Sequence, residues 1–322
     1  MTGKYEIRLY NNKVHYHLTV KRNITIFQGD SASGKSEMLR LLTTYNNRPE
    51  SSGITLICEK TCTVLTEEDW ELRLSMYHDR IIFIDEGNSF LRSKRFARYV
   101  KQSDNYFVII YRDSLYELPY SIEEIYGLHE SRSAQKYRNP KRIYNEQFHL
   151  YTAFPQAKMC PDKVIVEDSN SGYEFFCHVF GKKCISAKGK SNIKYLLLTQ
   201  SDDQKILVIA DGAAFGPEMQ ACMETVKSPA GNISIFAPEC FEYLVLKSDI
   251  LEVPSDVLEQ TFNLADSTLY FSWEEYYTQY LTEISQGTIY QYTKKKLSQS
   301  YLTAGNADKL KSTIPNCIDM TK

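Results

Sequence analysis

The sequence predicts an α/β protein of two domains that ends in a helical segment. The chain has 322 residues, 43% of them hydrophobic, which is enough for two cores of ordinary size. Short apolar runs alternate with helical patterns in residues 1–155, and a similar alternation begins again in residues 156–322. Such runs are typical of parallel strands that helices cover on both faces.

The expected elements of the first domain follow one another along residues 1–155. Two strands come first, at residues 5–10 and 14–20, and an Asn-Asn-Lys turn separates them. The remaining strands are expected at residues 24–27, 54–58, 81–84 and 106–111, and helices at residues 37–42, 69–77 and 90–100. Residues 131–161 hold basic residues and prolines, and we interpret them as the connection between the domains.

The second domain repeats this alternation of strand and helix. Strands are expected at residues 163–166, 184–187, 206–210 and 233–236, and helices at residues 172–180, 192–199, 217–226 and 240–246. Polar helices rich in tyrosine are expected to close the chain, at residues 255–262, 273–284 and 288–302. The pattern therefore predicts a second α/β domain with a helical C-terminal extension.

A glycine-rich segment between a strand and a helix gives the first indication of function. Residues 29–36 read Gly-Asp-Ser-Ala-Ser-Gly-Lys-Ser, which fits the P-loop pattern in its strand–loop–helix context. Lys35 would reach the β- and γ-phosphates of a nucleotide, and Ser36 would coordinate Mg²⁺. The backbone that would surround the phosphates belongs to Gly29, Asp30, Ser31, Ala32, Ser33 and Gly34.

A second apolar run, residues 80–84, ends in Asp85 and Glu86, which is the Walker B pattern. Asp85 would help to hold Mg²⁺, and Glu86 would orient or deprotonate the attacking water. No Asn-Lys-x-Asp run for guanine recognition is present in the sequence, which favours ATP over GTP. The pattern therefore predicts an ATPase, and a small-molecule kinase is less favoured because no arginine-rich lid segment is evident.

Acidic residues follow the strands expected in the second domain. Glu167 and Asp168 come directly after the first of these strands, Asp211 follows the third, and Glu239 and Glu242 follow the fourth. Carboxylates at the carboxyl edge of a parallel sheet suit Mg²⁺ or Mn²⁺, because hard cations prefer oxygen ligands. Such metals can activate water for phosphodiester cleavage. Solvated acids at the strand ends are the alternative interpretation.

In order and spacing, Glu167 and Asp211 resemble the acids of a Toprim domain, over residues 163–250. That family typically has a Glu after its first strand and an Asp-x-Asp after its third. The resemblance implies that Glu167 and Asp211 are catalytic and bind the metal. Ala213 departs from the pattern, because it stands where the family has its second Asp.

The combination of P-loop and Toprim-like half resembles bacterial and phage ATPase–Toprim proteins, including the overcoming-lysogenisation-defect nucleases. The resemblance implies that ATP controls a metal-dependent nuclease acting on DNA or tRNA, in anti-phage defence. The alternative is a nucleotide-dependent sensor whose inactive second half binds a partner protein or nucleic acid. A homo-oligomer is also expected, although the chain lacks the Leu-Ser-Gly-Gly run and the inserted arm of ABC-type relatives.

Basic residues provide three further candidates, although the net charge of −2 excludes a global polycation. A helix at residues 90–101 would present Lys94, Arg98 and Lys101 on one face. This face could reach a neighbour's nucleotide or a phosphate backbone, or it could be solvated surface. The basic stretch 132–142 could bind nucleic acid phosphates, or it could be a disordered linker. Arg112, at the end of an apolar strand, is either a γ-phosphate sensor or part of an ion pair.

The cysteines and the apolar runs indicate the cellular compartment of the protein. Eight cysteines are scattered, and although Cys58 and Cys62 are close, no second pair completes a zinc site. We expect reduced thiols, as in the cytoplasm. Charged residues interrupt the N-terminus, and no stretch approaches the ~20 apolar residues of a membrane span. The expectation is a cytoplasmic protein without a membrane partner.

Overall fold

The computed structural model describes residues 1–29, 34–131, 142–155, 157–201, 203–225 and 232–320. The chain forms two compact units. The first comprises Met1–Tyr120, Glu124–Leu150 and Phe262–Phe271, and the second comprises Ser121–Glu123, Tyr151–Thr261 and the residues from Ser272 on. Among the described helices, none is both long and apolar enough to span a membrane.

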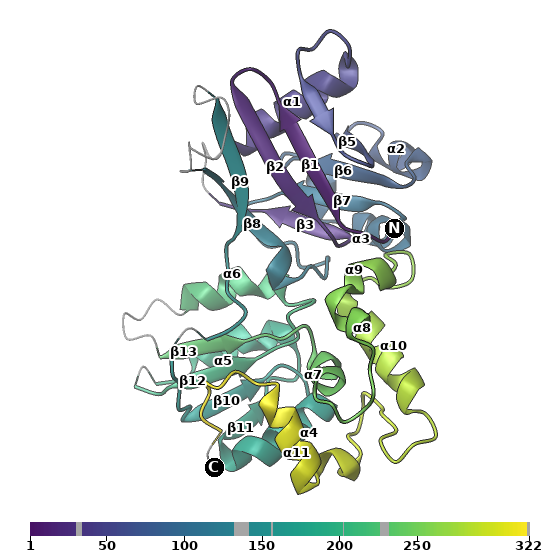
Figure 1. Cartoon of the computed structure of the whole chain (residues 1–322). Helices are drawn as coiled ribbons and strands as arrows, with labels where there is room; N and C mark the ends of the chain where they lie inside the picture. Colours follow the sequence, from purple (N-terminus) through teal and green to yellow (C-terminus); the bar gives the residue numbers. More distant parts are fainter. Residues whose placement is uncertain (30–33, 132–141, 156, 202, 226–231, 321–322) are drawn as a thin grey trace. The chain divides into compact units, whose positions relative to one another are not determined.

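The first unit is built on a curled mixed sheet, which has nine strands among the described residues (Figure 1). Its order is β4-β1-β2-β9-β8-β3-β7-β6-β5. The strands β5, β6, β7, β3 and β8 are parallel to one another, whereas β1 is antiparallel to both β2 and β4. The bounds are β1 Tyr5–Tyr10, β2 Val14–Val20, β3 Ile24–Phe27, β4 Thr55–Ile57, β5 Thr61–Leu65, β6 Arg80–Ile84, β7 Tyr106–Ile110, β8 Ile125–Glu130 and β9 Ile143–His149.

The helices of the first unit are α1 (Lys35–Asn47), α2 (Trp70–Met76) and α3 (Lys94–Gln102). The buried face of α1 carries Met38 and Leu42, which join one hydrophobic cluster with residues of β1, β2, β6 and β7. Burial of this apolar face, rather than helix propensity, is the main source of stability for such a helix. The cluster thereby fixes the helix that follows the glycine-rich loop.

Three strands of this sheet, β5, β8 and β9, were not expected from the sequence. Strand β9 lies in the stretch that we interpreted as an interdomain connection, and it pairs parallel with β2 and antiparallel with β8. Most of its residues are partly or fully exposed, so its apolar signal is weak. Strand β5 begins Thr-Cys-Thr and borders β6 alone, at the edge of the sheet. The interpretation of residues 131–161 as a connection was therefore wrong for Ile143–His149.

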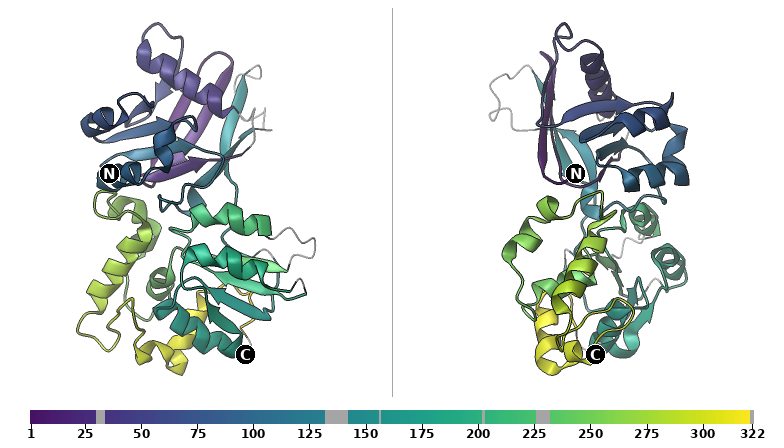
Figure 2. Two further views of the ribbon diagram at one scale, coloured as in Figure 1. Left: turned by 180° about the vertical axis from the view of Figure 1, so that it is seen from behind. Right: turned by 90° about the vertical axis from the view of Figure 1, so that its right-hand side faces the viewer.

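The second unit contains a parallel sheet, with four strands in the described part and the order β11-β10-β12-β13. Helix α4 packs on one face together with α7, where Phe175 and Phe176 contact Phe241. Helices α5 and α6 pack together on the other face (Figures 1 and 2). The bounds are β10 Lys163–Val166, α4 Ser171–Phe180, β11 Cys184–Ser186, α5 Ile193–Leu198, β12 Ile206–Ile209, α6 Gly216–Thr225, β13 Ile233–Phe236 and α7 Phe241–Lys247.

The C-terminal part is less helical than the sequence suggested. Its helices are α8 (Ser255–Glu259), α9 (Thr261–Leu264), α10 (Trp273–Ser285) and α11 (Ala304–Ser312). Instead of the helix expected at residues 288–302, the chain forms turns and a short 3₁₀ helix. Gly287, with φ 72°, turns the chain away from α10, and the Tyr292 N–H then donates to Ser285 Oγ.

Part of the expected second domain belongs to the first unit. The segment Phe262–Phe271 packs with the N-terminus, where the Gly3 N–H donates to the Phe262 carbonyl oxygen. The terminal amine of Met1 lies 2.9 Å from Ser267 Oγ and 3.1 Å from Asp266 Oδ1. These contacts depend on residues far apart in the sequence, so no local pattern could have revealed them.

Candidate functional sites

The glycine-rich loop begins after β3, the strand that lies between β7 and β8. Gly29 and Gly34 have φ 112° and 86°, a region that residues with side chains rarely adopt. A Cβ on Gly34 would also lie 3.1 Å from the Tyr16 hydroxyl oxygen. Both glycines are therefore required by the backbone at the ends of the loop. The predicted phosphate-binding residues between them, Asp30, Ser31, Ala32 and Ser33, lie outside the described residues.

Lys35 and Ser36 open helix α1 at the end of the loop. The buried Lys35 extends its ammonium group back to the start of the loop, where Nζ donates to the Gly29 carbonyl oxygen at 2.9 Å. Ser36 is exposed, and the N-cap residue of α1 is Gly34, which has no side chain that could cap the helix. The first N–H groups of α1 and the lysine can thus serve an anion at the carboxyl edge of the sheet.

Asp85 and Glu86 follow β6 at the same edge, with β7 between β6 and β3. Asp85 is exposed, and its Oδ1 accepts the Glu86 N–H at 2.9 Å. Glu86 Oε2 lies 3.0 Å from Arg112 Nε, just beyond the end of β7. Glu86 and Arg112 therefore form an ion pair in the structure. This is the second of the two roles that the sequence suggested for Arg112.

Some basic side chains of helix α3 already have partners within the first unit. Arg95 forms an ion pair with Glu71 at 2.5 Å, and Lys101 lies over the Phe271 ring. Lys94 and Arg98 are exposed. Most of the basic stretch 132–142 lies outside the described residues, apart from Arg142, whose guanidinium lies over the ring of Tyr10.

The acids of the second unit lie at the ends of two neighbouring strands whose connections lead to opposite faces of the sheet. Glu167 follows β10 and Asp211 follows β12, and these two strands are neighbours. The connection after β10 runs to α4 on one face, and the connection after β12 runs to α6 on the other (Figure 2). Such a switch point is the usual ligand site of an open parallel sheet. Pairing of β10 with β12 thus brings Glu167 and Asp211 to the same edge of the sheet.

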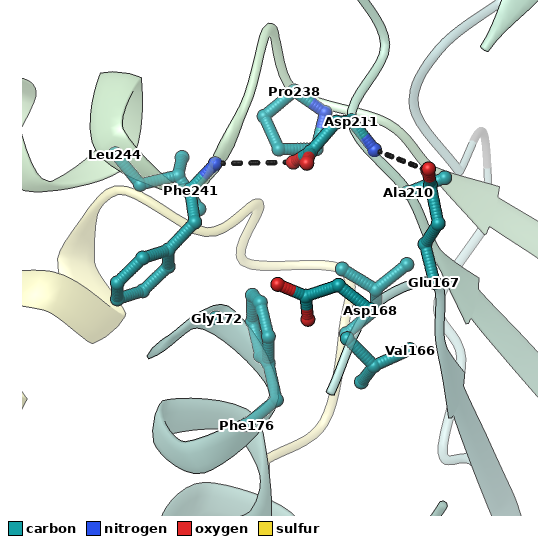
Figure 3. A pocket seen from close by; sticks show the side chains of 11 residues that line it. Val166, Glu167, Asp168, Gly172, Phe176, Ala210, Asp211, Pro238, Phe241 and Leu244 are labelled. Carbon is teal, nitrogen blue, oxygen red and sulfur yellow. Dashed lines mark hydrogen bonds between the residues drawn. The ribbon is translucent and has the colours of Figure 1, made fainter. Parts of the chain in front are cut away.

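Hydrogen bonds hold the acids in place (Figure 3). Glu167 Oε2 accepts the Asp211 N–H at 3.0 Å, and Asp211 Oδ1 accepts the Phe241 N–H at 3.2 Å. Asp168 Oδ1 accepts the Tyr173 N–H at 3.2 Å, in the first turn of α4. The two helix N-termini, of α4 and α7, thus each direct a backbone donor to a carboxyl group of the site.

These carboxyl groups retain protons more strongly than ordinary acids. Each keeps some exposed surface, but the surrounding protein displaces water and so raises the pKa of Glu167 to about 7. The pKa of Asp211 is raised well above its usual range, first by desolvation and then by the charges of Glu274 and Glu167. Desolvation also raises the pKa of Asp168. Desolvation is therefore the main cause of the raised pKa values, and the charges of neighbouring acids add to it.

Three residues of this site, Lys294, Glu274 and Tyr292, were missed by the sequence reasoning. Lys294 forms an ion pair with Glu274 of α10, and its charge lowers the pKa of Asp211. The Tyr292 hydroxyl donates to Glu242 Oε1 at 2.7 Å, and both residues are buried. Glu242 was noted only as an acid near a strand end. Lys294 belongs to the three-lysine run 294–296, which is typical of solvated surface. The sequence therefore gave no indication that Lys294 pairs with Glu274.

The site fits a metal ion only in part. A cavity of about 20 Å³, large enough for one water-sized particle, is lined by Glu167, Asp168 and Asp211. Within the described ranges, however, no group of three His, Cys, Asp or Glu side chains is arranged to hold a metal. Ala213 is buried and offers no ligand where the resemblance would place one. Positive charge near the acids comes instead from Lys294, which acts on Asp211, and from Lys190, which acts on Glu167.

Comparison with protein-family models gives no match for this chain, and comparison with curated proteins gives none either.

Proposed function

We propose that the protein binds ATP with Mg²⁺ and hydrolyses it in the first unit. The observation that carries the proposal is the glycine-rich loop with Lys35 after β3, at the same sheet edge as Asp85 and Glu86. A strand, a loop with two left-handed glycines and the N-terminus of a helix together suit a polyphosphate. A bare glycine turn would not require a buried lysine ammonium directed to its first residue.

Each residue has a role that follows from its position. Lys35 would exchange its bond to the Gly29 carbonyl oxygen for phosphate oxygens, because an ammonium group prefers the charged acceptor. Mg²⁺, held by Ser36 and Asp85, would neutralise phosphate charge. Glu86 would accept a proton from the attacking water or orient it. Its partner Arg112 could then turn to the developing charge on the γ-phosphate.

ATP turnover by the whole chain tests this proposal. Replacing Lys35 by Ala should lower the rate by about a hundredfold to a thousandfold, since one preorganised donor to a transition-state charge is removed. Lys182→Ala, at an exposed lysine of the second unit, is the matched control and should keep the wild-type rate. Equal turnover in wild type and Lys35→Ala would reject the P-loop as the hydrolytic site.

For the second unit, the first candidate function is a metal-dependent nuclease on DNA or tRNA that the nucleotide state controls. What supports it is the meeting of Glu167 and Asp211 at the switch point of the sheet. Phosphodiester cleavage would need Mg²⁺ or Mn²⁺ at these acids. We derive no catalytic step through a metal, because the described residues do not supply a full set of ligands.

The second candidate is a nucleotide-controlled regulatory unit that binds a partner without catalysis. The specific observations in its favour are Ala213, which is buried and lacks a carboxylate, and Lys294, which already supplies a cation. Anti-phage defence and a homo-oligomeric state rest on the resemblance alone and stay proposals.

Nuclease assays with Mg²⁺ or Mn²⁺, with and without ATP, separate the two candidates. If the second unit is a nuclease, DNA or tRNA should be cut by wild type and by Glu252→Ala, a control at an exposed acid, and not by Glu167→Ala. Absence of cleavage by wild type, with ATP turnover intact, would favour the regulatory unit. Cleavage that persists in Glu167→Ala would exclude this acid from the chemistry.

A further inference from the structure

A tyrosine of strand β2 contacts the last glycine of the glycine-rich loop. The Tyr16 hydroxyl donates to the Gly34 carbonyl oxygen at 2.8 Å, although the two residues are 18 positions apart in the sequence. Tyr16 is 1% exposed and belongs to the hydrophobic cluster that also holds the buried face of α1. The loop pattern at residues 29–36 does not include Tyr16, so this contact is a property of the fold.

The close approach of Tyr16 requires a glycine at position 34. A Cβ on Gly34 would lie 3.1 Å from the Tyr16 hydroxyl oxygen and 3.6 Å from its Cε1 atom. The backbone at Gly34 also has φ 86°, where a side chain is strained. The tyrosine and the left-handed backbone therefore depend on the same missing side chain.

Strand β9 holds Tyr16 in this place from the other side. In the parallel pairing of β2 with β9, Tyr16 lies opposite Asn145, which is also buried. Two positions further along β9, the Gln147 side chain binds the backbone of Thr19 in β2. Its Oε1 accepts the Thr19 N–H at 3.0 Å, and its Nε2 donates to the Thr19 carbonyl oxygen at 3.1 Å. Tyr16 is thus fixed by the sheet and not by the loop.

The Gly34 carbonyl oxygen accepts a second hydrogen bond, from the Met38 N–H at 3.0 Å. This is the first bond of helix α1, so the carbonyl group points along the helix. Among the described residues no peptide bond is cis, so the Gly34–Lys35 peptide group is planar and trans. The Lys35 N–H therefore points the opposite way, out of the N-terminus of α1, where N–H groups bind phosphate oxygens.

We propose that Tyr16 is a positioning residue of the nucleotide site, whose hydroxyl fixes the Gly34–Lys35 peptide group and so directs the Lys35 N–H at a phosphate oxygen. The inference rests on the proposed ATP-binding function. Tyr16 itself does not contact the nucleotide. It holds in advance a donor that would otherwise have to be oriented when ATP binds, and such preorganisation increases affinity.

The phenol of Tyr16 donates at every pH near neutrality. Burial raises the pKa of Tyr16 above its usual range, and the charge of Glu37 adds to this, whereas Arg40 acts in the other direction. Because the hydroxyl keeps its proton, Tyr16 is not a general base. Its contribution to nucleotide affinity should therefore be the same at about pH 6 and at about pH 9.

Calorimetric titration of the full chain with AMP-PNP and Mg²⁺ tests the proposal. Tyr16→Phe keeps the ring in the core and removes the hydroxyl alone. The dissociation constant of this variant should be about tenfold larger than that of wild type, because a donor to a charged group is no longer held in place.

Tyr106→Phe is the matched control for this titration. Tyr106 lies in β7 of the same unit and is 2% exposed, and its hydroxyl donates to a backbone carbonyl oxygen, that of Gly3, at 3.2 Å. Its affinity for AMP-PNP should equal that of wild type. An equal loss of affinity in both variants would overturn the proposal, because the loss of any buried hydroxyl in the unit would then be sufficient.

Steady-state kinetics separate positioning from catalysis. The Lys35 N–H would contact the phosphate both before and during hydrolysis. Tyr16→Phe should therefore raise KM by about tenfold and keep kcat within about twofold of wild type. A lower kcat at unchanged KM would overturn the proposal, because the hydroxyl would then act in the transition state alone.

The outcomes distinguish the role of Tyr16 from the proposed function. If wild type neither binds AMP-PNP nor hydrolyses ATP, the proposed function fails, and the inference fails with it. If wild type binds and Tyr16→Phe binds equally well, only the role of Tyr16 fails. NMR of wild type needs no variant: the Lys35 amide signal should shift when AMP-PNP binds, and an unshifted signal in the bound protein would overturn the inference.

Discussion

Acids stand at the carboxyl ends of parallel strands in both units, but the surroundings of the two sets differ. Asp85 is exposed, and Glu86 is paired with the largely exposed Arg112. Glu167 and Asp211 are instead joined to each other and crowded by further acids. Acids at strand ends thus have different surroundings in the two units. We call Asp85, Glu86 and Arg112 the open edge, and Glu167, Asp211 and the acids around them the closed cluster.

The difference teaches that position in a sheet does not determine the chemistry of a carboxylate. An exposed acid such as Asp85 is open to water and to ligands from the solvent. An acid among acids binds a proton or needs a cation, and in the second unit Lys294 supplies one. Four predictions test this contrast, beginning with the largest effect.

The open edge should depend on the charge of Glu86. Glu86→Gln should lower ATP turnover by about a hundredfold or more, since a group that accepts or positions the water proton is lost. ATP affinity, measured by calorimetry, should stay close to that of wild type. Glu117→Gln, at a nearby exposed acid, is the control. Unchanged turnover in Glu86→Gln would mean that this edge does not act as a base, and the contrast between the units would fail.

The closed cluster should make stability depend on pH through Glu167. Its pKa of about 7 in the folded protein lies above the ordinary 4.5, so folding takes up a proton between these values. The contribution of this group to the free energy of unfolding is therefore greatest below pH 4.5 and is lost as pH rises to 7. Because the Gln side chain cannot ionise, the free energy of unfolding of Glu167→Gln should be about 2 kcal/mol higher than that of wild type at pH 8.

Urea denaturation at pH 4.5 and pH 8 measures this effect. The two proteins should be nearly equal at pH 4.5, and Glu252→Gln should follow wild type at both values. A Glu167→Gln variant that is less stable than wild type at pH 8 would show that the ionised carboxylate is favourable in the fold. The cluster would then resemble the open edge.

Lys294 should stabilise the cluster as its internal cation. Lys294→Met should lower the free energy of unfolding at pH 7 by about 1–2 kcal/mol, a value reduced because the lysine side chain is 39% exposed. Lys295→Met is the control at an exposed neighbour. If Lys294 takes the place of a metal, millimolar Mn²⁺ should stabilise Lys294→Met more than wild type. Equal effects of Mn²⁺ on both proteins would exclude that role.

Local patterns predicted those parts of the fold whose residues are neighbours in sequence. The buried strand β3, the loop and α1 were evident because each is short, periodic and bounded by glycine. Strands β10 and β12 were evident as apolar runs that end in Glu167 and Asp211, and parallel pairing then brings the acids together. These are consequences of chain geometry, so the sequence was sufficient.

The remaining parts depend on distant contacts. Strand β9 has few buried residues and is held by pairing with β2 and β8, which no local pattern encodes. The sequence predicts a helix at residues 288–302, where the structure has turns and a short 3₁₀ helix, although the tyrosines and lysines there have ordinary helix preference. The Gly287 turn instead carries Tyr292 and Lys294 to the acids of the second sheet.

The smallest expected effect concerns Tyr292, whose hydroxyl is the part of this residue that contacts Glu242. The Phe variant keeps the ring packing and the bond from the residue 292 N–H to Ser285 Oγ, so it removes the hydroxyl alone. Tyr292→Phe should lower the free energy of unfolding by about 1 kcal/mol, because Glu242 is 2% exposed and water cannot readily replace the lost donor. Tyr195→Phe, at a 67% exposed tyrosine, should change stability little. A Tyr292→Phe variant as stable as wild type in urea denaturation would mean that Glu242 needs no donor. The cluster would then reduce to Glu167, Asp211 and their ion-paired neighbours, a much closer counterpart of the open edge.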